Sequence, residues 1–232
     1  MVSKIKEKLQ EALVRRQYKR YERQIAQQDI SYDSWIRQRE RDEGQPEMGG
    51  QEIQRQSKLR VAVVCYESCR ADFSLEDQAA KCDILVFHAS GGSVGARELQ
   101  IVADYFAGHP QTVIAYADED EIEPSGVRKN PWLKPDWSPD TLLSYFYFGG
   151  FFALRATACE KLTWPGEADW RHNLYDLALQ ATEITDSVGH LDRVLFHSEK
   201  IDVWGQQPCY EDLKQAAGRR RGWPQKPAGK VS

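Results

Sequence analysis

Three short apolar runs, separated by helical or loop segments, constrain the fold of this chain most. They read LRVAVVCYE over residues 59–67, DILVFHA over 83–89 and QTVIAYA over 111–117. Each is apolar without strict polar alternation, which indicates strands buried on both faces of a sheet. Between the second and third runs, residues 96–108 place apolar side chains at helical spacing. Strands that alternate with helices predict an α/β fold with a mainly parallel sheet flanked by helices.

The rest of the body continues this alternation. Residues from Ser138 onward begin a helix well, because Ser138 suits the cap and Pro139 suits the first helical position. The later segments predict a strand over 149–155, a short helix over 156–162, an amphipathic helix over 173–184 and a last strand over 190–198.

The chain is predicted to divide into four parts. Residues 1–45 form a helical N-terminal segment, whose second helix spans Tyr32–Glu43 with Ser31 as its cap. Residues 46–57 are a linker, and residues 58–205 are the α/β domain. The basic tail, residues 206–232, is rich in Pro and Gly and is expected to be mostly disordered.

Composition argues against several classes of protein. The sequence contains no apolar run of about 18 residues, so no transmembrane segment is expected, and its charged N-terminus lacks the apolar stretch of a secretory signal. Five cysteines without paired CxxC spacing disfavour a zinc site and a disulfide framework, and predict reduced thiols in the cytoplasm. The net charge is −4, with a basic front and an acidic body, which argues against a nucleic-acid partner.

The acidic stretch YADEDEIE, residues 116–123, directly follows the third strand. Adjacent carboxylates repel each other, and a bound cation relieves that repulsion. Three interpretations stay open for it: a hydrated or hydrogen-bonded loop, a role beside a bound substrate, and a displaced metal site.

Several motifs follow in a characteristic order. The acidic triplet Asp118–Asp120 is followed by KPDWSPD at Lys134–Asp140, a strand that ends at Arg155, YDLAL at Tyr175–Leu179 and RVLFH at Arg193–His197. In order and spacing, over about residues 83–200, these motifs resemble a bacterial branch of the family-2 glycosyltransferases. The KPDWSPD block carries most of this resemblance, because an acidic triplet alone is common.

The resemblance implies a Rossmann-like GT-A fold and the transfer of a sugar from a nucleotide sugar to a glycan acceptor. It also implies a divalent cation, manganese or magnesium, that neutralises the departing diphosphate, and a carboxylate base for the acceptor hydroxyl. In an active protein Asp118 and Asp120 would hold the metal, with His197 as a further ligand. Asp176 would stand in as the catalytic base.

The same resemblance implies that Asp136, Trp137 and Arg155 bind the substrate. Trp137 belongs to a group of aromatic residues that would either stack on sugars or form part of the core. The other members of the group are Trp132, Tyr145, Phe146, Tyr147 and Phe148.

Three features depart from the family pattern. Only residues 68–82 separate the first two strands, so one or two strand–helix units of the family's donor half are missing. Ala89–Gly91 stand where the metal-binding D-x-D is expected, and His88 beside them suits a structural role better than a metal site. Leu174 stands where the catalytic base is expected.

These observations predict a glycosyltransferase-like protein of glycan or cell-surface polysaccharide assembly, with its metal motif and base apparently lost. The alternative is a non-catalytic module that binds a glycan or a protein partner. In the alternative, residues 1–45 would dock a protein partner; their apolar stripe is otherwise expected to pack on the body or on a second copy. A cytoplasmic location is expected, with peripheral attachment to a membrane as the alternative.

Overall fold

The computed structural model describes residue 19 and residues 31–43, 57–167 and 169–200. These residues fall into two units, the helix α2 (Tyr32–Glu43) and a body that starts at residue 57, and each is described by itself. The first predicted helix apart from residue 19, nearly all of the predicted linker and the predicted tail lie outside the described residues. The predicted domain boundaries therefore stay predictions.

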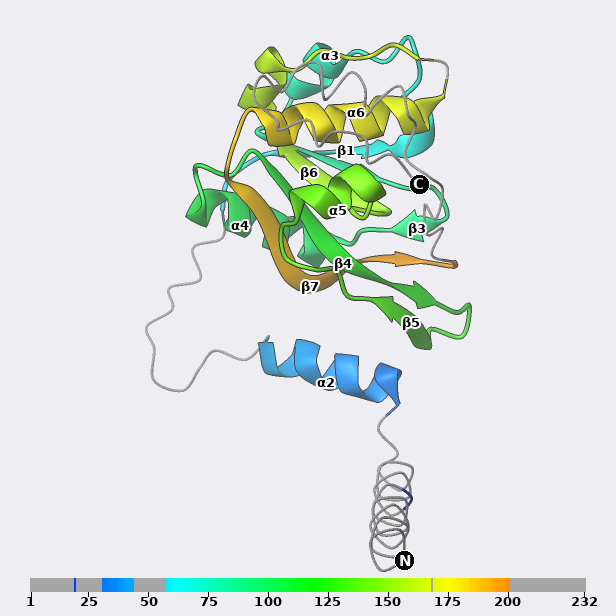
Figure 1. Ribbon diagram of the computed structural model, residues 1–232. Helices are drawn as coiled ribbons and strands as arrows, with labels where there is room; N and C mark the ends of the chain where they lie inside the picture. Colours follow the sequence, from blue (N-terminus) through cyan, green and yellow to red (C-terminus); the bar gives the residue numbers. More distant parts are fainter. Residues whose placement is uncertain (1–18, 20–30, 44–56, 168, 201–232) are drawn as a thin grey trace, which may run out of the picture. The chain divides into compact units, whose positions relative to one another are not determined.

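The body alternates strands with helices, as the apolar runs predicted (Figure 1). Its elements are β1 (Val61–Cys65), the 3-10 helix η1 (Tyr66–Ser68), α3 (Leu75–Ala79), β2 (Ile84–His88), β3 (Gly92–Ser93), α4 (Ala96–Gly108), β4 (Ile114–Ile122), β5 (Arg128–Trp132), α5 (Pro139–Ser144), β6 (Phe151–Arg155), the 3-10 helix η2 (Ala156–Lys161), α6 (Trp170–Glu183) and β7 (Val188–Ser198).

All strands belong to one seven-stranded sheet in the order β1-β2-β6-β4-β7-β3, with β5 paired to β4. β1 runs parallel to β2, and β4 runs parallel to β7. β6 lies between β2 and β4 and is antiparallel to both. The carboxyl ends of β1, β2, β4 and β7 therefore point toward the same edge of the sheet.

The three predicted strands do share one sheet, but the sheet is mixed, and only part of it has the predicted parallel arrangement. β6 separates β4 from β2, and β3 and β5 add further antiparallel pairs. The residues of β6 from Phe151 to Leu154 are fully buried. An apolar run of this kind predicts burial on both faces but carries no information about strand direction.

Helices cover both faces of the sheet, and adjacent strand residues alternate between two cores. In β2, Leu85 and Phe87 belong to the core that contains the buried side chains of α6. Ile84 and Val86 point the other way, into a core with Val102 and other residues of α4. This two-sided burial gives the sheet a rigid frame on which polar side chains can be held.

Side-chain caps fix where the helices near the strand ends begin. Ser138 accepts a hydrogen bond from the backbone N–H of Thr141, which confirms it as the cap of α5. Asp169 caps α6 in the same way through Arg171 N. These caps satisfy N–H groups that a helix cannot pair internally.

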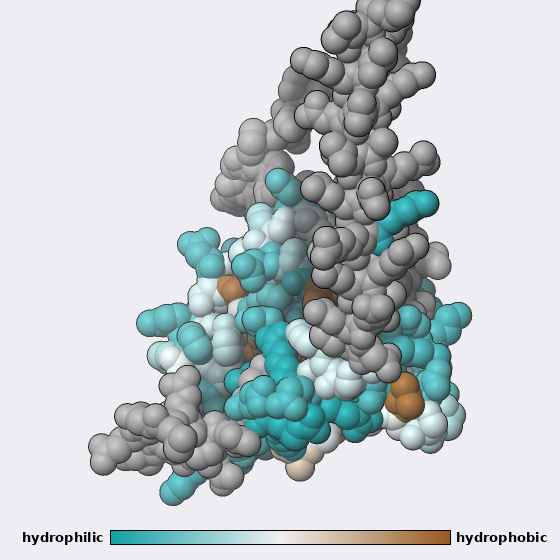
Figure 2. All heavy atoms as spheres, turned by 90° about the horizontal axis from the view of Figure 1, so that it is seen from below, coloured by the Kyte–Doolittle hydropathy of each residue, from teal (hydrophilic) through white to brown (hydrophobic). Residues whose placement is uncertain are grey.

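The surface of the described chain is mainly hydrophilic on the face shown in Figure 2, where hydrophobic side chains stand singly. The exposed large hydrophobic residues of the body are Val63, Val127, Leu133 and Ile184. Of these four, Val63 alone lies within a strand. No described helix is long and apolar enough to span a bilayer.

The described cysteines are all free thiols, as the sequence predicted. Burial raises the pKa of Cys69 to about 12 and that of Cys159 to about 12. These buried thiols are therefore protonated at neutral pH and act as small apolar groups.

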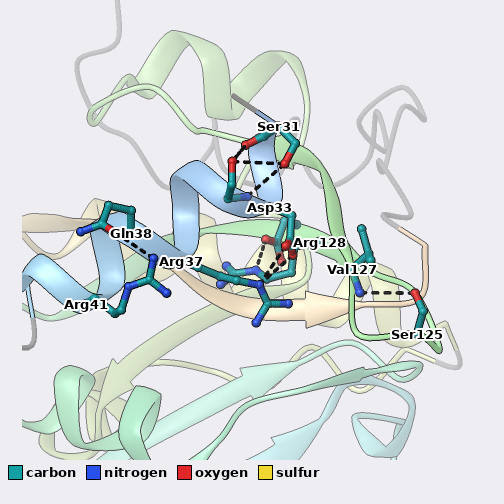
Figure 3. Close-up of polar contacts among 10 residues, drawn as sticks. Ser31, Asp33, Arg37, Gln38, Arg41, Ser125, Val127 and Arg128 are labelled. Atoms are coloured by element: carbon teal, nitrogen blue, oxygen red, sulfur yellow. Dashed lines mark hydrogen bonds and ion pairs between the residues drawn. The ribbon is translucent and has the colours of Figure 1, made fainter. Parts of the chain in front are cut away.

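The separate helix α2 has the predicted bounds, Tyr32–Glu43. Ser31 Oγ accepts a hydrogen bond from Ser34 N at 3.2 Å, which confirms the predicted cap. Arg37 folds back along the helix to Asp33, 2.9 Å from a carboxylate oxygen (Figure 3). The same figure shows Ser125 Oγ accepting from Val127 N in the turn between β4 and β5 of the body.

Candidate functional site

The acidic triplet lies inside the sheet. β4 continues through it to Ile122, so the interpretation of this stretch as a loop is wrong for the triplet. Asp118, Glu119 and Asp120 are at most 2% exposed. β4 and β7 pair irregularly here, with register shifts on both sides of Asp118. Because a buried carboxylate needs hydrogen bonds or a cation, the partners of each one define the chemistry of this region.

Asp118 is held by the chain that follows β5 and by β7. Its Oδ1 accepts from the backbone N–H of Lys134 at 2.8 Å and lies 3.0 Å from His190 Nε2. The other ring nitrogen of His190 lies 3.1 Å from Asp136 Oδ1. The imidazole also stacks on the ring of Tyr116, with centroids 4.8 Å apart.

The charge state of His190 follows from these contacts. Burial disfavours the charged imidazolium, but the hydrogen bonds to Asp118 and Asp136 outweigh it and raise the pKa of His190 above its ordinary value. An imidazole that donates from both nitrogens to carboxylates is the protonated form. Below its raised pKa, His190 is therefore an internal cation between the strand and the KPDWSPD block.

Glu119 faces a buried lysine. Lys134 Nζ lies 3.4 Å from Glu119 Oε1 and donates to the carbonyl of Phe148 at 2.5 Å. Glu119 also accepts from the backbone N–H of Gly150 at 3.0 Å. Burial raises the pKa of Glu119 and lowers the pKa of Lys134, and their mutual attraction opposes both shifts.

The close approach of this pair explains the two glycines before β6. A Cβ on Gly149 would meet Glu119, Trp132 and Lys134, and Gly149 has a φ of +69°. A Cβ on Gly150 would also meet the Glu119 carboxylate. Side chains larger than hydrogen would therefore break the pairing, in addition to the strain at Gly149.

Asp120 links three strands. Its Oδ2 lies 2.6 Å from Arg128 Nε of β5, and its Oδ1 lies 2.6 Å from His197 Nδ1 of β7. Beyond it the stretch reaches the surface, where Glu121 accepts from Asn130 and Glu123 pairs with Lys129 at 2.7 Å. Each carboxylate of the triplet thus has a basic side chain of the same chain beside it.

The predicted metal ligands are brought together only in part. Asp120 and His197 are in contact, whereas Asp118 pairs with His190 and the backbone of Lys134. Among the residues that the structure describes, no three His, Cys, Asp or Glu side chains form a group that could hold a metal ion. A metal role for Asp118, Asp120 and His197 stays a prediction.

The predicted substrate-binding residues separate into two places. Asp136 has a fully exposed side chain and Trp137 packs against the core beside Phe148. Arg155 lies at the other edge of the sheet, because it pairs with Ile84 at the start of β2. It donates to the carbonyls of Thr112, Phe106 and His109, so it ties α4 and the start of β4 to β6.

The predicted stand-in base lies within α6. Asp176 is buried and accepts from Gln180 Nε2 at 2.7 Å, one turn along the same helix. Gln180 in turn bonds both backbone groups of Thr163. Leu174, at the position where the family resemblance placed the base, is fully buried. The contact between Asp176 and Gln180 lies within α6, and the role of Asp176 as a base stays a prediction.

A further carboxylate, that of Glu67, lies at the carboxyl ends of β1 and β2 and belongs to none of the sequence motifs. Glu67 accepts from Ser90 N at 3.1 Å and Ser90 Oγ at 2.5 Å, next to the Ala89–Gly91 segment. Cys65 Sγ donates to the same carboxylate at 2.9 Å. Burial favours its neutral form, but these hydrogen bonds outweigh it and lower the pKa of Glu67.

Sequence reasoning missed His190, Arg128, Lys134 and Glu67 as partners in this region. One available signal was the apolar first half of β4. If the strand continues in the core, the three acidic residues that follow are buried as well. Buried carboxylates require nearby cations or hydrogen-bond donors. Three basic residues, Arg128, Lys129 and Lys134, follow within 16 residues of Asp118 and are the candidates that the sequence offers there.

Comparison with known proteins adds one likeness. No protein-family model matches the chain. Over 148 residues, or 63% of its length, the chain is 31% identical to the O-antigen biosynthesis protein RfbC of Myxococcus xanthus. The match covers 12% of that much longer protein. The likeness therefore concerns one segment of the relative and does not extend to that protein as a whole.

Proposed function

We propose that this chain is a glycosyltransferase-like module of bacterial polysaccharide assembly that does not by itself bind a nucleotide sugar. The name of the Myxococcus protein, which assigns it to O-antigen biosynthesis, supports the polysaccharide setting. The KPDWSPD block and its neighbouring motifs support the glycosyltransferase-like ancestry. The fold is compatible, since it is an α/β sheet whose parallel strands end at one edge, where ligands of such sheets bind.

One observation carries the proposal. The carboxylates of Asp118, Glu119 and Asp120 are each engaged by basic side chains of the chain itself. A diphosphate brings concentrated negative charge, so a metal that receives it needs carboxylates available for coordination. To bind a cation, Asp118 would have to give up its contact with His190 or bind both. Asp120 would likewise have to give up Arg128 and His197 or keep them beside the metal.

The β1–β2 half supports the same conclusion. The segment between β1 and β2 contains η1 and the five-residue helix α3, and β1 is the terminal strand of the sheet. In the described residues no further strand–helix unit follows β1 on that side. The donor half that the family resemblance implies is therefore shortened there, and Ala89–Gly91 supplies no carboxylate after β2.

Titration calorimetry with uridine and thymidine diphosphate sugars, with and without manganese, tests this proposal. We expect no metal-dependent heat at micromolar protein concentrations. Metal-dependent binding that disappears in both Asp118→Asn and Asp120→Asn would contradict it. Glu123→Gln is the matched control, because Glu123 lies on the same strand extension but pairs at the surface with Lys129.

A second candidate is an active transferase that uses manganese or magnesium. The contact between Asp120 and His197 favours it, since a carboxylate and an imidazole at this distance can share a cation. In that case Asp118 would be the further ligand, Asp176 the base, and Asp136 and Trp137 would bind the nucleotide sugar or its glycan acceptor. The calorimetry above separates the two candidates.

We further propose, for the non-catalytic reading, that a protein partner docks on residues 1–45 and that the module works in the cytoplasm. The charged helix α2, with its ion pair between Arg37 and Asp33, is the described part of that segment. Loss of the partner on removal of residues 1–45, with the unfolding midpoint of the body unchanged, is the expected result.

A further inference from the structure

β1 is a terminal strand that, among the described residues, pairs with another strand on one side only. It is the terminal strand of the sheet, and its five residues, VAVVC, contain no charge and no proline. Val63 in its centre is 45% exposed, whereas the paired residue Val86 on β2 is fully buried. An exposed apolar edge of this kind is a template for another strand, and soluble proteins usually block it.

The other edges of the same sheet are blocked. β7 carries Asp192 and Arg193 in its middle and pairs irregularly with β4. β5 contains Lys129 and Pro131, and β3 is only two residues long. Charges, proline, short length and irregular pairing are the usual protections of an edge strand, and β1 has only its short length.

The backbone of β1 leaves alternate residues available. Arg60 O accepts from Ile84 N, so in a parallel ladder Ala62 and Val64 also direct their backbone groups to β2. Val61 and Val63 then direct theirs outward, and neither has a backbone partner on that side among the described residues. Such groups gain most from a strand that pairs with them.

Charge selects the occupant. Lys58 and Arg60 are exposed just before β1, where Arg60 also pairs with Asp83 of its own chain. Glu67, which accepts from Ser90 and Cys65, follows β1. An antiparallel copy of the same strand brings the basic end of one chain to the acidic end of the other. A parallel neighbour would instead bring like charges together.

We propose that β1 pairs antiparallel with β1 of a second copy of this chain, about a two-fold axis at Val63. Val63 then lies opposite Val63 of the second copy, and Val61 lies opposite Cys65. The two exposed valine side chains bury each other on one face of a sheet that continues through both copies. This pairing is independent of the function proposed above.

Sedimentation equilibrium of the full chain across micromolar concentrations tests the pairing. Wild type is expected to be a reversible dimer. Val63→Lys places two like charges opposite each other and is expected to raise the dimer dissociation constant at least about tenfold. Val127→Lys is the matched control, because Val127 is 44% exposed but lies outside the strands, and it should leave the dissociation constant unchanged.

Urea unfolding shows whether Val63→Lys folds. If it does not fold, a chemical cross-link tests the same pairing. Val63→Cys treated with a short bis-maleimide should yield a dimer linked through position 63, identified by mass spectrometry, and Val127→Cys should not. A wild-type chain that stays monomeric overturns the proposal. A dimer that persists in Val63→Lys also overturns the proposal. That result is expected if the chains associate through residues 1–45, or if β1 binds a different protein.

Discussion

The β1–β2 half of the sheet and the half around β4 differ in whether they bury charged side chains. β1 and β2 contain no buried charged residue, and the one carboxylate at their carboxyl ends, Glu67, is held by uncharged groups of Ser90 and Cys65. β4 carries three carboxylates into the core and surrounds them with basic side chains from β5, β7 and the segment after β5. Both halves have the apolar strand starts that the sequence predicts.

This difference shows what the acidic stretch does in the fold. The carboxylates join β4 to its neighbours at a place where the ladder between β4 and β7 is irregular. Ion pairs there replace part of the regular backbone pairing, so removal of a single partner should affect stability. Among the described residues the β1–β2 half has no buried ion pair, so substitutions of its buried apolar residues should act through packing.

The largest effect is expected at the Glu119–Lys134 pair. Lys134→Met removes the buried cation and leaves Glu119 in the core, so the free energy of unfolding should fall by about 3–5 kcal/mol. Burial raises the pKa of Glu119, so this loss should shrink as the pH is lowered and Glu119 takes up a proton. Urea unfolding at several pH values measures both.

The double variant Lys134→Met with Glu119→Gln is the control for that pair. It removes both charges and keeps an acceptor for Gly150 N, so it should be more stable than Lys134→Met alone. Additive losses in the two single variants would mean that the two side chains do not act as a pair.

A smaller, pH-dependent effect is expected at His190. Its pKa is raised in the folded protein by Asp118 and Asp136, so its stabilisation is fully present below the unfolded pKa of about 6.5. It is lost as the pH rises through the folded pKa. The difference in unfolding free energy between wild type and His190→Gln should therefore be larger at pH of about 5.5 than at about 9.

A His190→Gln difference that grows with rising pH would show that the imidazole is held in its neutral form.

The smallest effect is expected where the same acidic stretch reaches solvent. Glu123 and Lys129 form an ion pair, but both side chains are more than 40% exposed. Surface pairs of this kind contribute little because solvent screens them. Glu123→Gln should leave the urea midpoint unchanged within error, and a loss comparable to that of Lys134→Met would remove the distinction between buried and exposed carboxylates.

Much of the fold was predictable from periodicity and caps. The helix over 96–108 and the helix Tyr32–Glu43 have their predicted bounds, and Ser138 caps α5 as expected. The position of β6 between β2 and β4 was not predictable, because strand order depends on packing between segments that are far apart in the sequence. The β4–β5 hairpin was missed because its strands are charged and lack the apolar signal that strand prediction uses.

The candidate site was predictable only as a set of residue types. The acidic triplet was found, but its partners come from positions 128, 134, 190 and 197, and contacts across such distances depend on the sheet register. Arg155 was grouped with Asp136 by resemblance, yet antiparallel β6 carries it to the other edge. Motif order gives no strand direction, and direction decides which residues meet.

Urea unfolding of wild type and Asp120→Asn, each with and without manganese, tests most directly whether the acidic strand serves the fold. Asp120→Asn should lower the unfolding free energy by about 2–4 kcal/mol without metal, because Arg128 and His197 lose a buried carboxylate. Manganese should stabilise neither protein. A metal site predicts the reverse: Asp120→Asn would be at least as stable as wild type without metal, and manganese would stabilise wild type alone.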